Sequence, residues 1–182
     1  RDLHSFPTRR SSDLFVNTEL IQELTENTVT GGVSMINQAL ADLWTGQEEH
    51  ELLMHDWYLG LLASAFGQLV YLDQPGELYR QHSNNVLGAR TLRKRMKNWI
   101  HPSRLFAKYW KLIKDSQTQA RNLLSQPLTT ENREIIENFV TIMEAPFAER
   151  LRRIRKYGYR KNRAFHTLVF TTLILTKFAY KE

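Results

Sequence analysis

The residues of this sequence that could do chemistry lie in two short polar stretches, and the first is Met54-His55-Asp56-Trp57. An apolar run at helical spacing follows, so the sequence predicts Asp56 at the beginning of a buried helix. The positive end of a helix favours the charged form of a carboxylate. Such a carboxylate can accept a proton from a sugar hydroxyl as a general base. The alternative is a capping aspartate that binds only backbone N–H groups of its own helix.

The second polar stretch is residues 79–85, which read Tyr-Arg-Gln-His-Ser-Asn-Asn. Arg80 can bind a phosphate group through two parallel hydrogen bonds. His82 can bind a divalent metal ion or a phosphate oxygen, and Asn85 offers a neutral donor and acceptor. Loops that follow strands carry many ligand contacts in α/β proteins. A polar turn with a partly exposed histidine is the alternative interpretation.

Hydrophobic spacing predicts the elements that would position these stretches. Residues 52–66 are predicted as a buried helix that ends at Gly67. Asn37 is the predicted cap of a short helix that continues through Trp44. Short strands are predicted over residues 33–36, 68–72 and 78–82. This part of the chain therefore predicts a small α/β unit.

The carboxyl-terminal half is predicted to be helical. A long amphipathic helix is expected over residues 102–124. Thr130 is the predicted cap of the next helix, which Pro146 should kink and Gly158 should end. Residues 160–181 form the last predicted helix.

The formal net charge of +6 is divided unevenly along the chain. Residues 90–182 contain 21 Lys and Arg against 7 Asp and Glu (+14), and residues 1–89 contain 4 against 12 (−8). Such a split predicts two surfaces with different partners. The basic half could bind phosphates of lipids or of nucleic acid, and a solvated helical surface is the alternative. The change in composition predicts a domain boundary near residues 88–97.

The absence of cysteine excludes disulfides, thiolate zinc sites and a cysteine nucleophile. Residues 1–14 show neither the apolar segment of a signal peptide nor a helical or strand period. Their letters match the translation of a common sequencing-library adapter. We therefore interpret residues 1–14 as an artefactual tail and leave them out of the fold prediction.

Together, the two polar stretches resemble family 2 glycosyltransferases, especially the rhamnosyltransferase-like members of bacterial polysaccharide clusters. The resemblance depends on the His-Asp-Trp motif at 55–57 and on the Tyr-Arg-Gln-His-x-x-Asn-x-x-Gly pattern at 79–88. The Thr-Gly-x-x-x-Met-x-Asn segment at 30–37 is similar to the acceptor-side segment that precedes His-Asp-Trp in that family. The resemblance covers residues 29–89.

The resemblance implies an α/β fold of the GT-A type and an enzyme that inverts the anomeric centre. By position, Asp56 would be the general base. His82 would help to hold a divalent metal, Mg²⁺ or Mn²⁺, or the diphosphate, and Arg80 would support the diphosphate. Trp57 would contact the acceptor or pack its helix. The residues implied in substrate binding are Gly31, Gly32, His55, Trp57, Arg80, Gln81 and Asn85.

The sequence departs from the family on the donor side. Family members carry nucleotide-binding strands and an Asp-x-Asp metal motif in their amino-terminal half, and this sequence contains no Asp-x-Asp. We therefore interpret residues 15–90 as the carboxyl-terminal part of a GT-A domain and residues 91–182 as a basic helical extension. The whole enzyme is expected to transfer a sugar, such as rhamnose, from a nucleotide-sugar to a lipid-linked or polysaccharide acceptor. This fragment is not expected to catalyse transfer by itself.

The basic segment 150–163 precedes a mostly apolar segment, 164–180, that is short for a membrane span of about 20 residues. The sequence predicts an interfacial helix whose cations lie on anionic headgroups. This predicts a cytoplasmic protein at the inner face of the membrane, and an ordinary packed helix is the alternative. The side chains expected to face lipid are Phe165, Leu168, Phe170 and Leu173.

A non-enzymatic basic module that binds membrane or nucleic acid is the alternative function. Aromatic residues are interleaved with the cations, as in many nucleic-acid-binding proteins. However, Tyr109 and Trp110 lie on an apolar helical stripe, and no helix-turn-helix or RNA-binding signature is present. We therefore expect no nucleic-acid partner.

Overall fold

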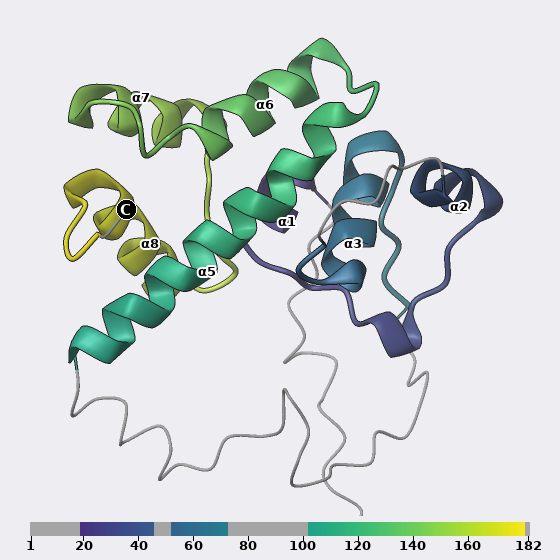
Figure 1. Ribbon diagram of the computed structural model, residues 1–182, viewed down its shortest axis with the longest axis horizontal. Coiled ribbons are helices and arrows are strands. Elements are labelled where there is room, and N and C mark those ends of the chain that lie inside the picture. The colour runs from purple at the N-terminus through teal and green to yellow at the C-terminus, as the bar shows by residue number, and fades with distance from the viewer. Residues whose placement is uncertain (1–18, 46–51, 73–101, 181–182) are drawn as a thin grey trace, which may run out of the picture.

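The computed structural model describes residues 19–45, 52–72 and 102–180, and within these ranges every regular element is helical (Figure 1). The predicted α/β fold class is therefore wrong for this part of the chain. The α-helices are α1 (Leu20–Glu23), α2 (Gln38–Thr45), α3 (His55–Phe66), α5 (Pro102–Asn122), α6 (Thr130–Val140), α7 (Phe147–Tyr157) and α8 (Ala164–Thr176). Two 3₁₀ turns are η2 (Gly31–Val33) and η3 (Leu123–Ser125).

The predicted strands fail because a strand requires a partner to take its backbone hydrogen bonds. Residues 33–36 instead follow a tight turn, in which the Val33 N–H donates to the Thr30 carbonyl at 3.1 Å. In the segment 68–72, Val70 and Leu72 are 75% and 62% exposed, and none of the described segments pairs with it. The third predicted strand, 78–82, lies outside the described residues.

Local signals predicted the helices well. Asn37 caps α2, because its Oδ1 accepts the Leu40 N–H at 3.0 Å. Most of the predicted helix 52–66 is present as α3, and Gly67 follows as its C-cap. The cap of α6 is Thr129 rather than Thr130, with its side chain accepting the Asn132 N–H at 3.2 Å.

Pro146 separates two helices rather than kinking one. It is the N-cap residue of α7, where a missing backbone N–H costs nothing. Gly158 ends α7 as predicted, with a φ of 69° in the left-handed region that glycine adopts without steric cost.

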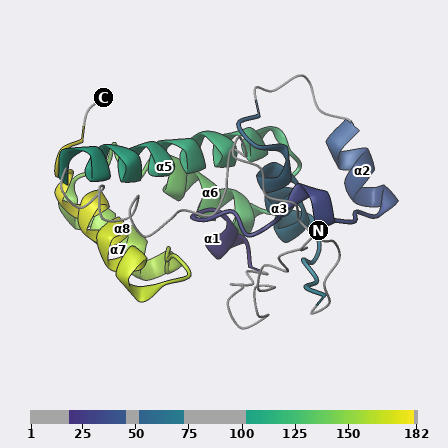
Figure 2. The same cartoon turned by 90° about the horizontal axis from the view of Figure 1, so that it is seen from below.

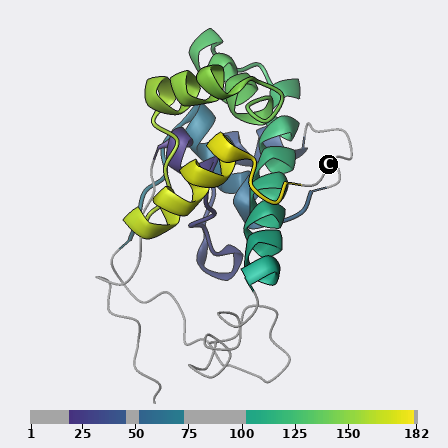
Figure 3. The ribbon, with the colours of Figure 1, turned by 90° about the vertical axis from the view of Figure 1, so that its left-hand side faces the viewer.

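Helix α5 runs across the molecule, and different helices pack against its two halves (Figures 1 and 2). Its carboxyl-terminal half contacts α3 and α6, and α2 lies on the outer side of α3. Its amino-terminal half contacts α8, which packs in turn against α7 (Figure 3). One hydrophobic core joins residues from both sides of the predicted domain boundary, including Leu61, Leu62, Ile113, Ile136, Phe139 and Phe170.

Helix α8 does not present the four predicted side chains to one surface. Phe170 and Leu173 are 0% and 2% exposed and belong to the core. Phe165 and Leu168 are 62% and 64% exposed. The prediction of lipid-facing side chains is therefore wrong for Phe170 and Leu173. None of the helices in the described ranges combines the length and apolar character needed to cross a bilayer.

Candidate functional site

The residues between α1 and η2 lie against the first turn of α3. Gly31, the first residue of η2, lies close to the same turn, because an added Cβ would lie 2.9 Å from His55 Nε2 and 3.4 Å from Asp56 Cβ. A larger residue at this position would collide with the histidine ring. The structure thus brings together Gly31, His55 and Asp56, which the sequence placed in one site. Gly32, which follows Gly31 in η2, is exposed.

Asp56 is held by neutral donors. Its Oδ1 accepts a hydrogen bond from Asn27 Nδ2 at 3.2 Å and from the Trp57 N–H at 2.7 Å. Asn27 in turn accepts the Val29 N–H at 2.9 Å through its own Oδ1. One amide therefore ties the loop to the half-buried carboxylate. Asp56 also occupies the first turn of α3, where the helix dipole favours a negative charge.

The beginning of α3 is fixed from the other side by α5. The buried Gln119 accepts the Leu53 N–H at 3.0 Å and donates to the Met54 carbonyl at 2.7 Å. These two bonds hold the backbone just before the helix starts. They fix the direction in which the helix leaves and therefore where its first turn, with Asp56, is presented.

Trp57 points into the core rather than to the surface. It is 5% exposed, and its Nε1 donates to the Glu23 carbonyl at 2.8 Å. The tryptophan therefore links α3 to the end of α1. Its contribution to the site is to hold the scaffold on which Asp56 lies.

Glu23 lies beneath the same loop. Its carboxyl group accepts the Thr28 N–H at 3.2 Å and the Thr28 hydroxyl at 2.9 Å. An added Cβ at Gly60 would lie 2.9 Å from Glu23 Oε1, so α3 closes over the carboxyl. Burial, with smaller contributions from the nearby charges of Asp56 and Glu26, raises the pKa of Glu23 to about 7.

The second predicted stretch cannot be placed beside the first. Arg80, Gln81, His82 and Asn85 all lie outside the described residues. The metal ion expected at His82 stays a prediction. In the ranges that the structure covers, no group of three or more His, Asp or Glu side chains is suited to hold a metal ion.

Three residues that organise the site were missed from the sequence: Glu23, Asn27 and Gln119. An acid in a turn that also contains Leu20, Ile21 and Leu24 is a usable signal for a buried carboxyl. Nothing local points to Asn27 or Gln119, because their partners are 29 and at least 65 residues away in the sequence.

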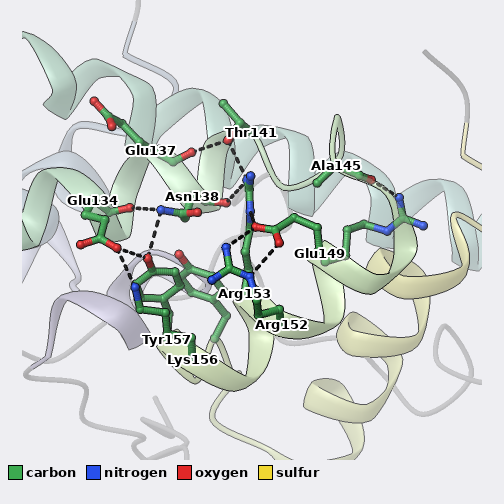
Figure 4. A network of polar contacts seen from close by, with 12 residues as sticks. Glu134, Glu137, Asn138, Thr141, Ala145, Glu149, Arg152, Arg153, Lys156 and Tyr157 are labelled. Atoms are coloured by element: carbon green, nitrogen blue, oxygen red, sulfur yellow. Dashed lines mark hydrogen bonds and ion pairs between the residues drawn. The ribbon is translucent and has the colours of Figure 1, made fainter.

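The basic segment of α7 is largely bound within the fold (Figure 4). Arg152 and Arg153 donate to Glu149, with distances of 2.7 to 2.9 Å. Lys156 reaches Glu134 of α6 at 2.7 Å. The hydrogen bonds from Arg152 and then Arg153 lower the pKa of Glu149 to about 2. Lys156 therefore joins α7 to α6, and Arg152 and Arg153 offset the negative charge of Glu149 within α7.

Other groups of the carboxyl-terminal half are also used internally. Arg150 is buried and donates to the carbonyls of Ala145 and Leu175. Trp110 is 4% exposed and donates to the Phe178 carbonyl at 2.8 Å, and Tyr159 is buried. The basic and aromatic groups available to a phosphate or a nucleic-acid base are correspondingly fewer than the sequence indicates.

No protein-family model matches the chain, and neither a curated protein nor a solved structure does. The arrangement at α3 is then the best guide to function. It consists of a carboxylate at the positive end of a helix, oriented by an amide, beside an exposed histidine and a glycine turn. Such a set can accept a proton from a bound hydroxyl and hydrogen-bond the hydroxyls next to it.

Proposed function

We propose that residues 27–32 and 55–57 form the acceptor side of an inverting glycosyltransferase site, with Asp56 as the general base. The observation that supports this best is the contact between two segments of the sequence resemblance. Gly31, from the Thr-Gly segment, lies directly against His55 and Asp56 of the His-Asp-Trp motif. These segments are 24 residues apart in the chain and have no local reason to meet.

The chemistry requires a base beside the acceptor hydroxyl. In inverting transfer the hydroxyl oxygen bonds to the anomeric carbon as its proton passes to the base, and the nucleoside diphosphate leaves from the opposite face. The bond from Asn27 to Asp56 Oδ1 fixes the direction of the carboxylate before the acceptor binds. His55 is exposed on the same turn and can hydrogen-bond a neighbouring sugar hydroxyl.

On the donor side, Arg80 and His82 are proposed to bind the diphosphate, with Gln81 and Asn85 beside them. A divalent cation, Mg²⁺ or Mn²⁺, would supply charge stabilisation to the leaving diphosphate. The donor would be a nucleotide-sugar, and the acceptor a lipid-linked or polysaccharide sugar such as those of bacterial cell-surface polymers.

The acceptor half of the proposal can be tested on this chain alone. Methyl rhamnoside and methyl N-acetylglucosaminide are titrated into the ¹⁵N-labelled protein while NMR shifts are followed. We expect saturable shifts at Gly31, His55 and Asp56, and weaker binding after Asp56→Asn. Asp42→Asn is the matched control, because Asp42 is exposed on α2 and bonds to Gln38. Shifts confined to other surfaces, or equal binding by both variants, would reject the acceptor site.

The base is tested in a polypeptide that joins these residues to a donor-binding half with an Asp-x-Asp motif. Asp56→Asn should lower kcat for sugar transfer by about 10²- to 10⁴-fold, the usual contribution of a general base. Donor binding should be unchanged, because Asp56 acts on the acceptor. Turnover at the wild-type rate in this variant would rule out the base.

We also propose that the protein associates peripherally with an anionic membrane surface through α8. Phe165 and Leu168 are one turn apart and more than 60% exposed, and they directly follow the exposed residues Arg160 and Arg163. Apolar side chains beside cations are the pattern of interfacial helices. This position would suit an enzyme whose acceptor is linked to a lipid.

Flotation with vesicles of phosphatidylglycerol and phosphatidylcholine tests the membrane proposal. Phe165→Ser with Leu168→Ser should reduce the bound fraction about tenfold, since two large apolar contacts are lost. Met35→Ser is the control, because Met35 is 87% exposed and belongs to the segment after η2. Equal flotation of both variants would reject α8 as the contact surface. Flotation without any saccharide response would instead favour the non-enzymatic module.

A further inference from the structure

Glu23 is a buried acid with only neutral partners in the part of the chain that the structure describes. The residue is 0% exposed, and its carboxyl group accepts two hydrogen bonds, both from Thr28. None of the ion pairs among the described residues includes it. A buried carboxylate without a cation is strongly disfavoured against its neutral acid.

The charges around Glu23 do not supply the missing cation. Asp56 on α3 and Glu26 on its own segment both add negative charge. Lys161 reaches this region, but its Nζ donates to the Thr25 carbonyl. Arg160 contributes only its backbone carbonyl, which accepts the Thr25 hydroxyl. Tyr109 of α5 and His166 of α8 interact electrostatically with Glu26.

The partners of Glu23 connect it to the proposed base. Thr28, which Glu23 binds twice, is flanked by Asn27 and Val29. Asn27 binds both the Val29 N–H and the Asp56 carboxylate. Release of Thr28 would therefore loosen its two neighbours, Asn27 and Val29, and with Asn27 the bond that orients Asp56.

We infer that Glu23 is a positioning residue that holds the 27–31 loop against α3 most firmly as the neutral acid. Loss of its proton leaves a buried charge without a cation and weakens the contact of Asn27 with Asp56. The inference rests on the proposed function for the role of Asp56, but the loop movement itself is measured without activity. Such a dependence of the loop on the Glu23 proton would make the acceptor side of the site sensitive to pH near neutrality.

The direction of the pH dependence follows from burial. Burial raises the pKa of Glu23 to about 7 in the folded chain. The carboxyl is neutral below that pH, and the loop is closed. As the pH rises through 7 the carboxylate forms, and solvation of its charge favours the open loop.

Amide hydrogen exchange at Thr28 tests the inference, because its N–H is bound to the Glu23 carboxyl group that holds the loop. After correction for intrinsic rates, wild-type protection should be constant below pH 4.5, fall by up to about tenfold per pH unit between pH 4.5 and pH 7, and level off above pH 7, as linkage to one proton requires. Glu23→Gln is neutral and its amide can donate to the Thr28 hydroxyl. Its protection should stay level with pH.

Glu19→Gln is the matched control, because Glu19 is an exposed acid four residues earlier, and it should behave as wild type. Equal loss of protection in wild type and Glu23→Gln would overturn the inference. If Glu23→Gln does not fold, the ¹³C carboxyl titration of Glu23 in the wild type decides. A midpoint near pH 7 supports the inference, and a midpoint near pH 4.5 overturns it. These outcomes are independent of the Asp56→Asn saccharide experiment, so the two proposals can fail separately.

Discussion

Glu23 and Glu149 are both acids that accept hydrogen bonds, but they lie in opposite surroundings. Glu23 is enclosed by the 27–31 loop and α3 and is bound by Thr28, and burial raises its pKa to about 7. Glu149 lies at the surface between Arg152 and Arg153, whose hydrogen bonds lower its pKa to about 2. Burial without a cation keeps Glu23 neutral up to about pH 7, and hydrogen bonds from two guanidinium groups keep Glu149 charged.

The same contrast divides the molecule into two regions. In the region of α1 and α3, buried polar groups control where a loop lies, so a change of charge alters structure. In the α6–α7 region, exposed ion pairs join helices that already pack through Ile136, Phe139 and Ile154. A change of charge there should leave the structure in place. The following variants test this division, beginning with the largest expected effect.

Trp57→Ala should cost about 3 to 5 kcal/mol of unfolding free energy, the usual range for removal of a buried tryptophan. The ring is 5% exposed, and its N–H bonds to the Glu23 carbonyl. Urea denaturation measures the change. Trp57→Phe keeps most of the volume and should lose about 1 to 3 kcal/mol, for a buried carbonyl left without its donor. A loss below 1 kcal/mol for Trp57→Ala would mean that the α1–α3 region is not a core region.

Stability should fall by about 3 kcal/mol between pH 4.5 and pH 7 because of Glu23, since each unit of pKa difference is worth 1.36 kcal/mol. The pKa in the folded chain lies above the ordinary value of 4.5 for a glutamate, so the contribution is fully present below pH 4.5. It is lost as the pH rises through 7. Chemical denaturation at a series of pH values measures it.

In Glu23→Gln the fall should be absent, while Glu19→Gln should retain it. If Glu23→Gln shows the same pH profile as wild type, another group causes the fall and the contrast with Glu149 is lost.

The helices and their ends could be predicted because their signals are local. Asn37, Gly67 and Gly158 end or begin helices through their own backbone geometry or side chains, and each was identified from its type and position. The strands could not be predicted in this way. A short apolar run such as 68–72 becomes a strand only beside a partner, which no local pattern reveals.

The candidate site was predictable in part for the same reason. His55 and Asp56 were identified by their place at the beginning of an apolar helix. Asn27 and Gln119, which orient that helix and its carboxylate, act across 29 or more residues. The number of cations in the basic tail that are available to a ligand was overestimated, because the sequence shows the cations but not their partners in the fold.

Gly60→Ala tests how tightly α3 closes over Glu23. An added methyl would lie 2.8 Å from Val29 Cγ2 and 2.9 Å from Glu23 Oε1, so both contacts must be relieved by a shift of these side chains or of the helix. Overpacking should cost about 1 to 3 kcal/mol, of which alanine's higher helix propensity recovers up to about 1 kcal/mol. We expect a net loss of unfolding free energy. A net gain would show that Glu23 has room to move and that the enclosure is loose.

Glu149→Gln should have the smallest effect on stability at pH 7. Glu149 is partly exposed at the surface, so its ion pairs with Arg152 and Arg153 are weakened by solvent and salt. Its pKa is lowered on folding, so its contribution is present above pH 4.5 and is lost as the pH falls toward 2, opposite in direction to that of Glu23. Thermal unfolding at pH 7 should therefore change little, and the difference from wild type should shrink further in 1 M NaCl.

Glu131→Gln is a suitable control, because Glu131 is an exposed acid on the adjacent helix α6. A loss as large as that of Trp57→Ala, unaffected by salt, would show that the α6–α7 network is structural and that the two regions do not differ as described.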